Sequence, residues 1–207
     1  MIKKIVIGTN NQHKAREIRE ILDGLPVELL TLEEFENIEP VPEDAHTLGE
    51  NAALKALGFA RQTGLPTVAD DSGLEVDALD GRPGVHSARY AGPDATYQQL
   101  CEKLLGELKD APEDKRSARF RCCVCMADSE GVKLEVDGAV EGRIIFEMKG
   151  DEGFGYDPVF VPIGYNSTFA QMSPEMKNSI SHRGVAFRRF RDKLKELLEK
   201  GYGSTNV

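Results

Sequence analysis

Directly after Met1 the chain reads Ile2-Lys3-Lys4-Ile5-Val6-Ile7-Gly8-Thr9-Asn10-Asn11, and this stretch decides the class of fold. The run at 2–8 is rich in Ile and Val and ends in small and polar residues, which predicts a buried strand followed by a tight turn. Apolar residues then recur at helical spacing, which predicts a helix over 13–22. A strand, a turn and a helix in this order favour an α/β fold with ligands at the carboxyl ends of its strands.

The following segments continue this alternation and then change to hairpins. The sequence predicts a second strand over 27–32, a helix over 51–62 and a short third strand over 67–69. Thr47 and Glu50 form a capping box ahead of the second helix. The later predicted elements are a helix, an antiparallel hairpin, a short strand and a last helix, over 96–105, 120–144, 158–162 and 181–200. We therefore expect a mixed sheet flanked by helices, in one domain over 1–207 without a linker.

The composition excludes several classes of protein. The 207 residues are 40% hydrophobic and 29% charged, as in an ordinary globular protein, so a wholly disordered chain is excluded. Lys and Arg total 26 against 35 Asp and Glu, and the net charge of -9 argues against a protein that wraps nucleic acid or coats an anionic membrane. No stretch reaches the roughly 18 apolar residues of a membrane span, and the apolar start is too short for a signal peptide. We expect a cytoplasmic protein with neither nucleic acid nor membrane as partner.

Four cysteines occur, at Cys101, Cys122, Cys123 and Cys125. Three of them fall in one predicted strand, which is poor spacing for a framework of disulfides. Cys122 and Cys125 form a C-x-x-C, but neither a second pair nor a nearby histidine completes a zinc site. We interpret them as small strand residues, with a zinc or redox site as the alternative.

The first candidate site is the segment 9–14, between the end of a strand and the start of a helix. A helix N-terminus carries N–H groups without intrahelical partners and a partial positive charge, so it suits an anion. Lys14 would add a full charge in the first turn. The segment is not a Walker A loop, because no Gly-Lys-Ser/Thr closes it. The alternative is an ordinary helix cap.

The second candidate site is Asp70-Asp71-Ser72-Gly73, directly after the apolar residues of the third strand. Two adjacent carboxylates are unfavourable unless a cation or a proton shares them, and Mg²⁺ accounts for the pair. The alternative is a solvent-exposed turn, because Asp, Ser and Gly form turns. A further carboxylate for a metal could come from the acidic connection or the next helix, at Glu39, Glu43, Asp44 or Glu50.

The third candidate site combines the segments 153–158 and 177–183. Seven Lys or Arg and one acidic residue lie between Lys177 and Lys195, so basic charge is concentrated there. The basic side chains around the start of the last helix oppose its dipole, which favours an anionic or base-bearing ligand as their reason. Phe154 could offer a ring face to a nucleobase, with Asp157 as an acceptor at its edge. For 188–195 a solvated helix face is the simpler interpretation.

Six segments in one order resemble the inosine/xanthosine triphosphate pyrophosphatase family, and the match spans nearly the whole chain. The segments are Thr-Asn-x-x-x-Lys at 9–14, Glu-Asn-Ala with a lysine at 50–55, Ala-Asp-Asp-Ser-Gly-Leu at 69–74, Gly-x-Pro-Gly-Val-x-Ser-Ala-Arg-Tyr at 81–90, Phe-Gly-Tyr-Asp-Pro at 154–158 and Ser-His-Arg at 181–183. The resemblance implies hydrolysis of ITP, dITP and XTP to the monophosphate and pyrophosphate by water attack on the α-phosphorus. It also implies Mg²⁺ as cofactor and a homodimer of elongated, two-lobed subunits with the active-site cleft between the lobes.

The resemblance also assigns roles to residues. Asp71 would be general base and metal ligand, with Lys55 as its catalytic partner, and Lys55 and Ser72 would hold phosphate oxygens. Glu43 and Asp70 would be further metal carboxylates, with Glu50 as a lesser contributor. The triphosphate would lie against Thr9, Asn10, Asn11, Gln12, His13 and Lys14. The base would be enclosed by Phe154, Gly155, Tyr156, Asp157, Lys177, His182 and Arg183. Donors around the base would favour the 6-oxo group of hypoxanthine and xanthine over the 6-amino group of adenine.

Three other functions remain open at this point. A pyrophosphatase of the same type could act on pyrimidine or modified nucleotides. A regulator could sense a triphosphate without cleaving it, although such a protein gains little from a general base beside a metal. Nucleic-acid binding is disfavoured by the net charge of -9.

Overall fold

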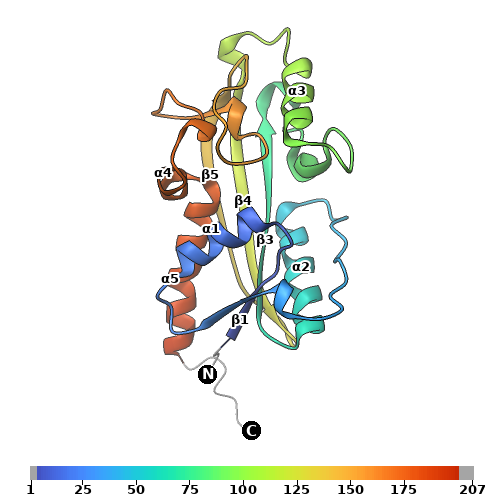
Figure 1. The fold of residues 1–207 in the computed structure, drawn as a ribbon, viewed down its shortest axis with the longest axis vertical. Helices are drawn as coiled ribbons and strands as arrows, with labels where there is room; N and C mark the ends of the chain where they lie inside the picture. Colours follow the sequence, from blue (N-terminus) through green and yellow to red (C-terminus); the bar gives the residue numbers. More distant parts are fainter. Residues whose placement is uncertain (1–3, 201–207) are drawn as a thin grey trace. The chain divides into compact units, whose positions relative to one another are not determined.

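The computed structural model describes residues 4–200, which form six strands in one sheet with the order β2-β1-β3-β4-β5-β6 (Figure 1). By its internal contacts the chain separates into two compact units. Unit 1 comprises 1–71, 122–138 and 184–207, and unit 2 comprises 72–121 and 139–183. The strands β3 (Thr67–Val76), β4 (Ser117–Asp128) and β5 (Gly131–Ile144) contribute residues to both units.

Unit 1 contains the strand and helix that the opening sequence predicts. The strand β1 pairs in parallel with both β2 and β3. The elements of this unit, besides the shared strands, are β1 (Lys4–Ile7), α1 (Gln12–Leu22), β2 (Glu28–Thr31), α2 (Leu48–Thr63) and all but the first two residues of α5 (His182–Glu199). Residues 2 and 3 of the first predicted strand lie outside the described residues.

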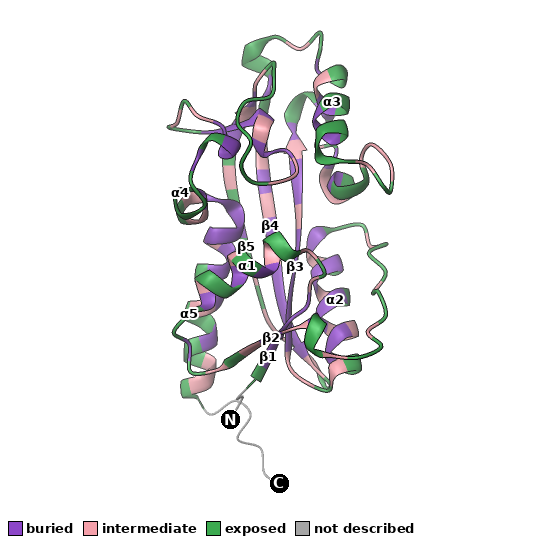
Figure 2. Ribbon diagram, viewed as in Figure 1, coloured by how far each residue is buried: buried purple, intermediate pink, exposed green. Residues whose placement is uncertain are grey.

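Alternation along β1 explains the two apolar layers of unit 1. Ile5 and Ile7 belong to one buried cluster, together with residues of α1 and α5. Val6, between them, belongs to another cluster with Phe59 of α2. Successive side chains of a strand point to opposite faces, so α1 and α5 cover one face of the unit 1 strands and α2 covers the other. The outward face of α1 is exposed (Figure 2).

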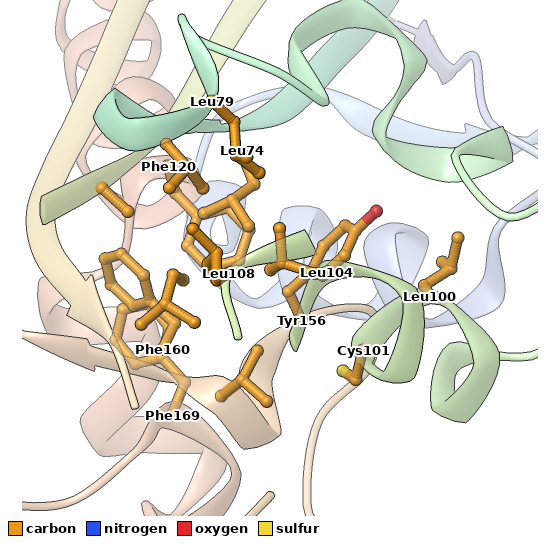
Figure 3. Packing of buried hydrophobic residues seen from close by; sticks show 14 of the residues in the cluster. Leu74, Leu79, Leu100, Cys101, Leu104, Leu108, Phe120, Tyr156, Phe160 and Phe169 are labelled. Carbon is orange, nitrogen blue, oxygen red and sulfur yellow. The ribbon is translucent and has the colours of Figure 1, made fainter. Parts of the chain in front are cut away.

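Unit 2 is built around a second apolar core (Figure 3). Its own elements are α3 (Tyr97–Glu107), β6 (Phe160–Pro162), α4 (Pro174–Ile180) and several short 3₁₀ helices, of which η3 (Gly84–Arg89) matters below. The ring of Phe120 from β4 lies 4.7 Å from that of Phe160 and 6.1 Å from that of Phe169, centroid to centroid. Tyr156 lies within the same cluster and is 3% exposed.

The observed elements confirm the predicted mixed α/β sheet flanked by helices. The capping box of α2 forms as predicted: the Thr47 hydroxyl accepts the N–H of Glu50 and the Glu50 carboxylate accepts the N–H of Thr47. Gly64 follows the helix with φ of 69°, the left-handed conformation expected of a C-cap glycine. The hairpin of β4 and β5 turns at residues 129 and 130.

One predicted boundary is wrong, and one helix is missing from the prediction. The third strand does not stop at residue 69, because β3 continues through Asp70-Asp71-Ser72-Gly73 to Val76. Leu74 and Val76 are buried in the core of unit 2, and this packing outweighs the turn propensity of the four preceding residues. The short helix α4 is also absent from the prediction, although Ser173 caps it and Pro174 opens it, a combination typical of a helix start.

The three cysteines of β4 are the small strand residues that the sequence predicts, and Cys101 lies in α3. All four are free thiols, and those on β4 are buried except Cys123, which is half-buried. Over residues 4–200, no helix is both long and apolar enough to cross a membrane.

Candidate active site

In unit 1 a buried carboxylate, Asp71, is held by two side chains of α2. The amide Nδ2 of Asn51 donates to Oδ2 of Asp71 at 3.1 Å, and the ammonium Nζ of Lys55 lies 3.4 Å from Oδ1. Asn51 and Lys55 are four residues apart on one helix, so their side chains leave the same face of α2. Asp71 and Lys55 are each 7% exposed and Asn51 is fully buried. Both oxygens of the Asp71 carboxylate therefore have a donor from the same helix.

The same two side chains also fix the acidic connection that precedes α2. Nζ of Lys55 lies 2.8 Å from Oε2 of Glu43, so one ammonium contacts two carboxylates. Oδ1 of Asn51 accepts the backbone N–H of Ala45 at 3.0 Å. Asn51 thus binds Asp71 with one end of its amide and the connection with the other, which sets Glu43 at a defined distance from Asp71.

Burial and charge act in opposite directions on the two ionisable groups at the centre. Burial raises the pKa of Asp71 above its usual value, although Lys55 and Lys14 oppose this. Burial alone would lower the pKa of Lys55, but the carboxylates of Asp71, Asp70 and Glu43 outweigh it and raise that pKa. Lys55 is therefore a cation at neutral pH, and Asp71 is a better proton acceptor than a surface aspartate.

The neighbouring carboxylate, Asp70, has a different lysine. Nζ of Lys14 lies 3.0 Å from Oδ2 of Asp70, and the thiol of Cys122 lies 3.7 Å from the same oxygen. Consecutive residues of a strand point to opposite faces, so Asp70 and Asp71 are directed apart. The sequence argument that one shared cation must relieve the pair is therefore replaced by two separate ion pairs.

The donor set of unit 1 fits a magnesium ion bound by few protein ligands. Asp71 and Glu43 contact the same ammonium and offer carboxylate oxygens, and Mg²⁺ usually takes one or two carboxylates with phosphate oxygens and waters. Within residues 4–200, no group of three or more His, Cys, Asp or Glu is placed to hold a metal ion. Asp70 is paired with Lys14, and the Glu50 carboxylate accepts from Thr47 in the capping box. The fit therefore rests on Asp71 and Glu43.

The segment 9–14 forms the turn and first residues of α1. Asn11 is the N-cap, and its side-chain oxygen accepts the N–H groups of His13 and Lys14. The hydroxyl of Thr9 accepts the N–H of Asn11 at 3.2 Å, and the amide of Gln12 donates to Glu33. Asn10, Gln12 and His13 are exposed. The cap leaves Lys14 as the cation that accompanies this helix N-terminus.

In unit 2 the second group of predicted residues gathers around the ring of Phe154. Nζ of Lys177 lies 4.4 Å from the ring centroid and Cζ of Arg183 lies 5.4 Å from it. The ring of Tyr97 is 6.1 Å away, centroid to centroid. Arg183 also donates to the hydroxyl of Ser72 at 3.2 Å, so the cation beside the ring also binds a residue of β3.

Asp157 fixes the loop that carries Phe154. Its Oδ2 accepts the backbone N–H of Phe154 at 2.8 Å and lies 2.8 Å from Nζ of Lys177. The side chains of Asp157 and Lys177 are both buried, which makes the pair a brace within unit 2. His182 is buried as well, and its ring stacks on Phe120 at 4.7 Å between centroids.

A sequence model of the Ham1 family matches residues 5–193 of this chain. The chain belongs to the Ham1 family. It is 46% identical over 191 residues to a protein of Geobacter sulfurreducens named dITP/XTP pyrophosphatase, covering 92% of this chain and 96% of that protein. It is 48% identical over 191 residues to a protein of Porphyromonas gingivalis with the same name, covering 92% and 97%.

Solved structures of the Ham1 family share the fold. A HAM1 protein from Coxiella burnetii superposes with a TM-score of 0.87 at 39% identity, covering 94% of this chain and all of that one. The Ham1 protein of Staphylococcus aureus gives a TM-score of 0.84 at 37% identity, covering 94% of this chain and 99% of that one.

For this Ham1 chain, the residues predicted from sequence form two clusters, one in each unit. The Asp71 cluster of unit 1 contains Asp71, Lys55, Glu43, Asp70 and Lys14. The Phe154 cluster of unit 2 contains Ser72, Phe154, Asp157, Lys177 and Arg183. The hydrogen bond from Asn51 to Asp71 and the contact between Tyr97 and Phe154 are not predicted from sequence. The position of Asn51 one helical turn before Lys55 was the available signal.

Proposed function

We propose that this Ham1 family chain hydrolyses deaminated purine nucleoside triphosphates, namely ITP, dITP and XTP, to the monophosphate and pyrophosphate. One observation carries the proposal: a buried carboxylate with a raised pKa, Asp71, is held between Asn51 and Lys55, in a chain whose relatives are named dITP/XTP pyrophosphatase. A carboxylate placed in this way is suited to accept a proton from a water molecule.

In the proposed reaction, Asp71 removes a proton from a water that attacks the α-phosphorus. The proton goes to the Asp71 carboxylate, and the oxygen of the water forms a new bond to the α-phosphorus. The bond between the α-phosphorus and the oxygen that bridges it to the β-phosphorus breaks, and pyrophosphate leaves with this oxygen. Lys55 and Ser72 are each proposed to bind phosphate oxygens of the substrate. Little covalent chemistry is asked of the protein, so positioning and electrostatics supply most of the reduction of the barrier.

Mg²⁺ fits the carboxylates of Asp71 and Glu43, and when bound it would neutralise charge that develops on the phosphate oxygens. Asp70, whose Oδ2 pairs with Lys14, is proposed as a less central metal carboxylate. Lys14 and the N-terminus of α1 would bind the β- and γ-phosphates, with Thr9 to His13 forming the turn around them. Positive charge at this place stabilises the pyrophosphate that leaves.

The Phe154 cluster of unit 2 is proposed to receive the base. The face of Phe154 can stack on a purine, and Arg183 and His182 can donate hydrogen bonds to a 6-oxo group. Adenine presents a 6-amino donor at that position, which would leave the donors of the site without partners. Gly155 and Tyr156 shape the loop, and Asp157 and Lys177 fix it.

A triphosphate sensor is the second candidate function, and the geometry argues against it. A sensor has no need to raise the pKa of a buried carboxylate beside a lysine. We also propose that the chain works as a homodimer in the cytoplasm as one catalytic domain; four free thiols suit a reducing compartment.

The test is release of pyrophosphate from ITP, XTP, ATP, GTP and dTTP in parallel, each with Mg²⁺ and with EDTA. We expect release from ITP and XTP that requires Mg²⁺ and returns when Mg²⁺ is added back after EDTA. Preference for dTTP would favour the pyrimidine alternative. Binding of ITP without release of pyrophosphate would replace the proposed function with the sensor.

A further inference from the structure

The segment 81–90 carries a sequence motif to which the proposed function gives no role. In the structure this segment contacts the Phe154 loop (153–156), which carries Phe154 and Tyr156. Within η3, the hydroxyl of Ser87 accepts the backbone N–H of Leu74 at 2.9 Å and donates to the carbonyl of Gly84 at 2.6 Å. Leu74 follows Ser72 by two residues on β3. The side chain of Ser87 therefore fastens η3 to the part of β3 that carries Ser72.

The backbone of Ser87 makes the second connection. The hydroxyl of Tyr156, in the Phe154 loop, donates to the carbonyl oxygen of Ser87 at 2.9 Å. Tyr156 is 3% exposed, and its ring lies in the apolar core of unit 2 (Figure 3). Its side chain is thus directed into the core, and its hydroxyl ties the loop to η3.

The fit between η3 and β3 leaves no free space at residue 73. A Cβ atom at Gly73 would collide with the carbonyl oxygen of Gly84 and would lie 3.2 Å from the hydroxyl oxygen of Ser87. Gly73 is therefore required for the close approach that lets Ser87 reach the N–H of Leu74. A side chain at residue 73 would therefore force η3 and β3 apart.

These contacts form a closed circuit within unit 2. Ser72 binds Arg183, Arg183 lies against the ring of Phe154, and the chain leads from Phe154 to Tyr156. The circuit returns from Tyr156 through Ser87 to Leu74, and along β3 to Ser72. The distance between Ser72 and the ring of Phe154 is thus determined from two sides, once through Arg183 and once through Ser87.

We propose that Ser87 and the Tyr156 hydroxyl are positioning residues that fix the Phe154 loop relative to Ser72, and that they thereby set the selectivity for the purine base. The inference rests on the proposed function, because it assigns the Phe154 loop to the base. Neither group has to touch the substrate. Loss of the link loosens the base site and leaves the Asp71 cluster intact.

The test compares Tyr156→Phe with Tyr165→Phe. Tyr156→Phe removes only the hydroxyl that binds Ser87. Tyr165 packs against the same core, and among the described residues its hydroxyl has no hydrogen-bond partner, so Tyr165→Phe is the matched control. For Tyr156→Phe we expect KM for ITP to rise about three- to tenfold with kcat within about twofold, and the ratio of kcat/KM for ITP over ATP to fall by a similar factor.

A second variant tests whether Ser87 and the Tyr156 hydroxyl act through one circuit of contacts. Ser87→Ala removes the bonds to Leu74 and Gly84, and we expect the same loss of selectivity. The double variant should lose no more selectivity for ITP over ATP than the more affected single variant, because either change alone interrupts the circuit of contacts. Losses that add, a Tyr156→Phe enzyme with wild-type KM and selectivity, or equal losses in Tyr165→Phe would overturn the inference. Wild-type protein that releases no pyrophosphate from ITP would instead refute the proposed function.

Discussion

The Asp71 cluster of unit 1 and the Phe154 cluster of unit 2 are both built around a buried lysine, but their charge balance is opposite. Lys55 contacts the carboxylates of Asp71 and Glu43, and nearby Lys14 is paired with Asp70. Three carboxylates thus face two ammonium groups. In unit 2 the carboxylate of Asp157 pairs with Lys177, and two cations, Lys177 and Arg183, face the ring of Phe154.

This difference indicates what each cluster can bind. An excess of carboxylate over ammonium groups favours a further cation, and the proposed Mg²⁺ at Asp71 and Glu43 would supply one. An excess of positive charge over a ring face favours an electron-rich, flat ligand such as an oxo-purine. We therefore expect changes in the Asp71 cluster to lower kcat for every base, and changes in the Phe154 cluster to alter KM and the choice of base.

The largest expected effect is that of Asp71→Asn. The amide cannot accept the proton of the attacking water, so kcat for ITP should fall by about 10³-fold or more, while binding of ITP is largely kept. Pyrophosphate release and calorimetric binding measure the two quantities. Asp80→Asn is the control, because Asp80 is exposed and its φ of 53° is one that asparagine tolerates. Unaltered kcat in Asp71→Asn would remove Asp71 from the mechanism.

Asn51→Asp should have the next largest effect. The change replaces the donor at 3.1 Å from Oδ2 of Asp71 with a like charge, which turns the carboxylate away from its position. We expect kcat to fall by about 10²-fold for ITP and XTP alike. Gln62→Glu makes the same chemical change at an exposed position of α2 and should keep wild-type kcat. A rise in KM alone would contradict a role of Asn51 in orienting Asp71.

Lys14→Ala tests the triphosphate end of the unit 1 cluster. Removal of the charge beside the N-terminus of α1 should weaken binding of ITP by roughly 10- to 100-fold and binding of the monophosphate much less. Titration calorimetry with ITP and inosine monophosphate measures the difference. Lys4→Ala, on the exposed start of β1, is the control. Equal losses for the two ligands would argue against Lys14 as a contact of the β- and γ-phosphates.

The smallest expected effect is that of Arg183→Lys in unit 2. Lysine keeps the charge but loses the flat guanidinium that lies over Phe154 and binds Ser72. KM for ITP should rise about tenfold with kcat little changed, and the preference for ITP over ATP should narrow. Arg189→Lys, at an exposed position of α5, is the control. A fall in kcat with unchanged KM would break the proposed division between the two clusters.

The sequence predicts the opening of the fold well because the signals there are local. The apolar run of β1, the capping box of α2 and the glycine after that helix each act within a few residues. The length of β3 is not local, because Leu74 and Val76 are buried by side chains from distant segments. Turn propensity at Asp70 to Gly73 therefore gives the wrong boundary.

The chemistry of the candidate site is predictable from sequence, whereas its internal partners are not. Asp71, Lys55 and Glu43 stand out by residue type and motif, and the structure brings them together. The pairing of Asp157 with Lys177 joins residues 20 positions apart, and such a pair is created only by tertiary packing. The sequence predicts Asp157 only as an acceptor at the edge of the base, whereas in the structure its carboxylate accepts the N–H of Phe154.

The pleat of β3 directs three consecutive residues toward different partners. Asp70 pairs with Lys14, Asp71 with Lys55 and Asn51, and Ser72 with Arg183. Insertion or deletion of one residue upstream in this strand would move every side chain to the opposite face and separate all these partners at once. A change in the length of β3 would therefore disturb both clusters together, whereas a substitution at one of these three positions would remove the partners of one residue alone.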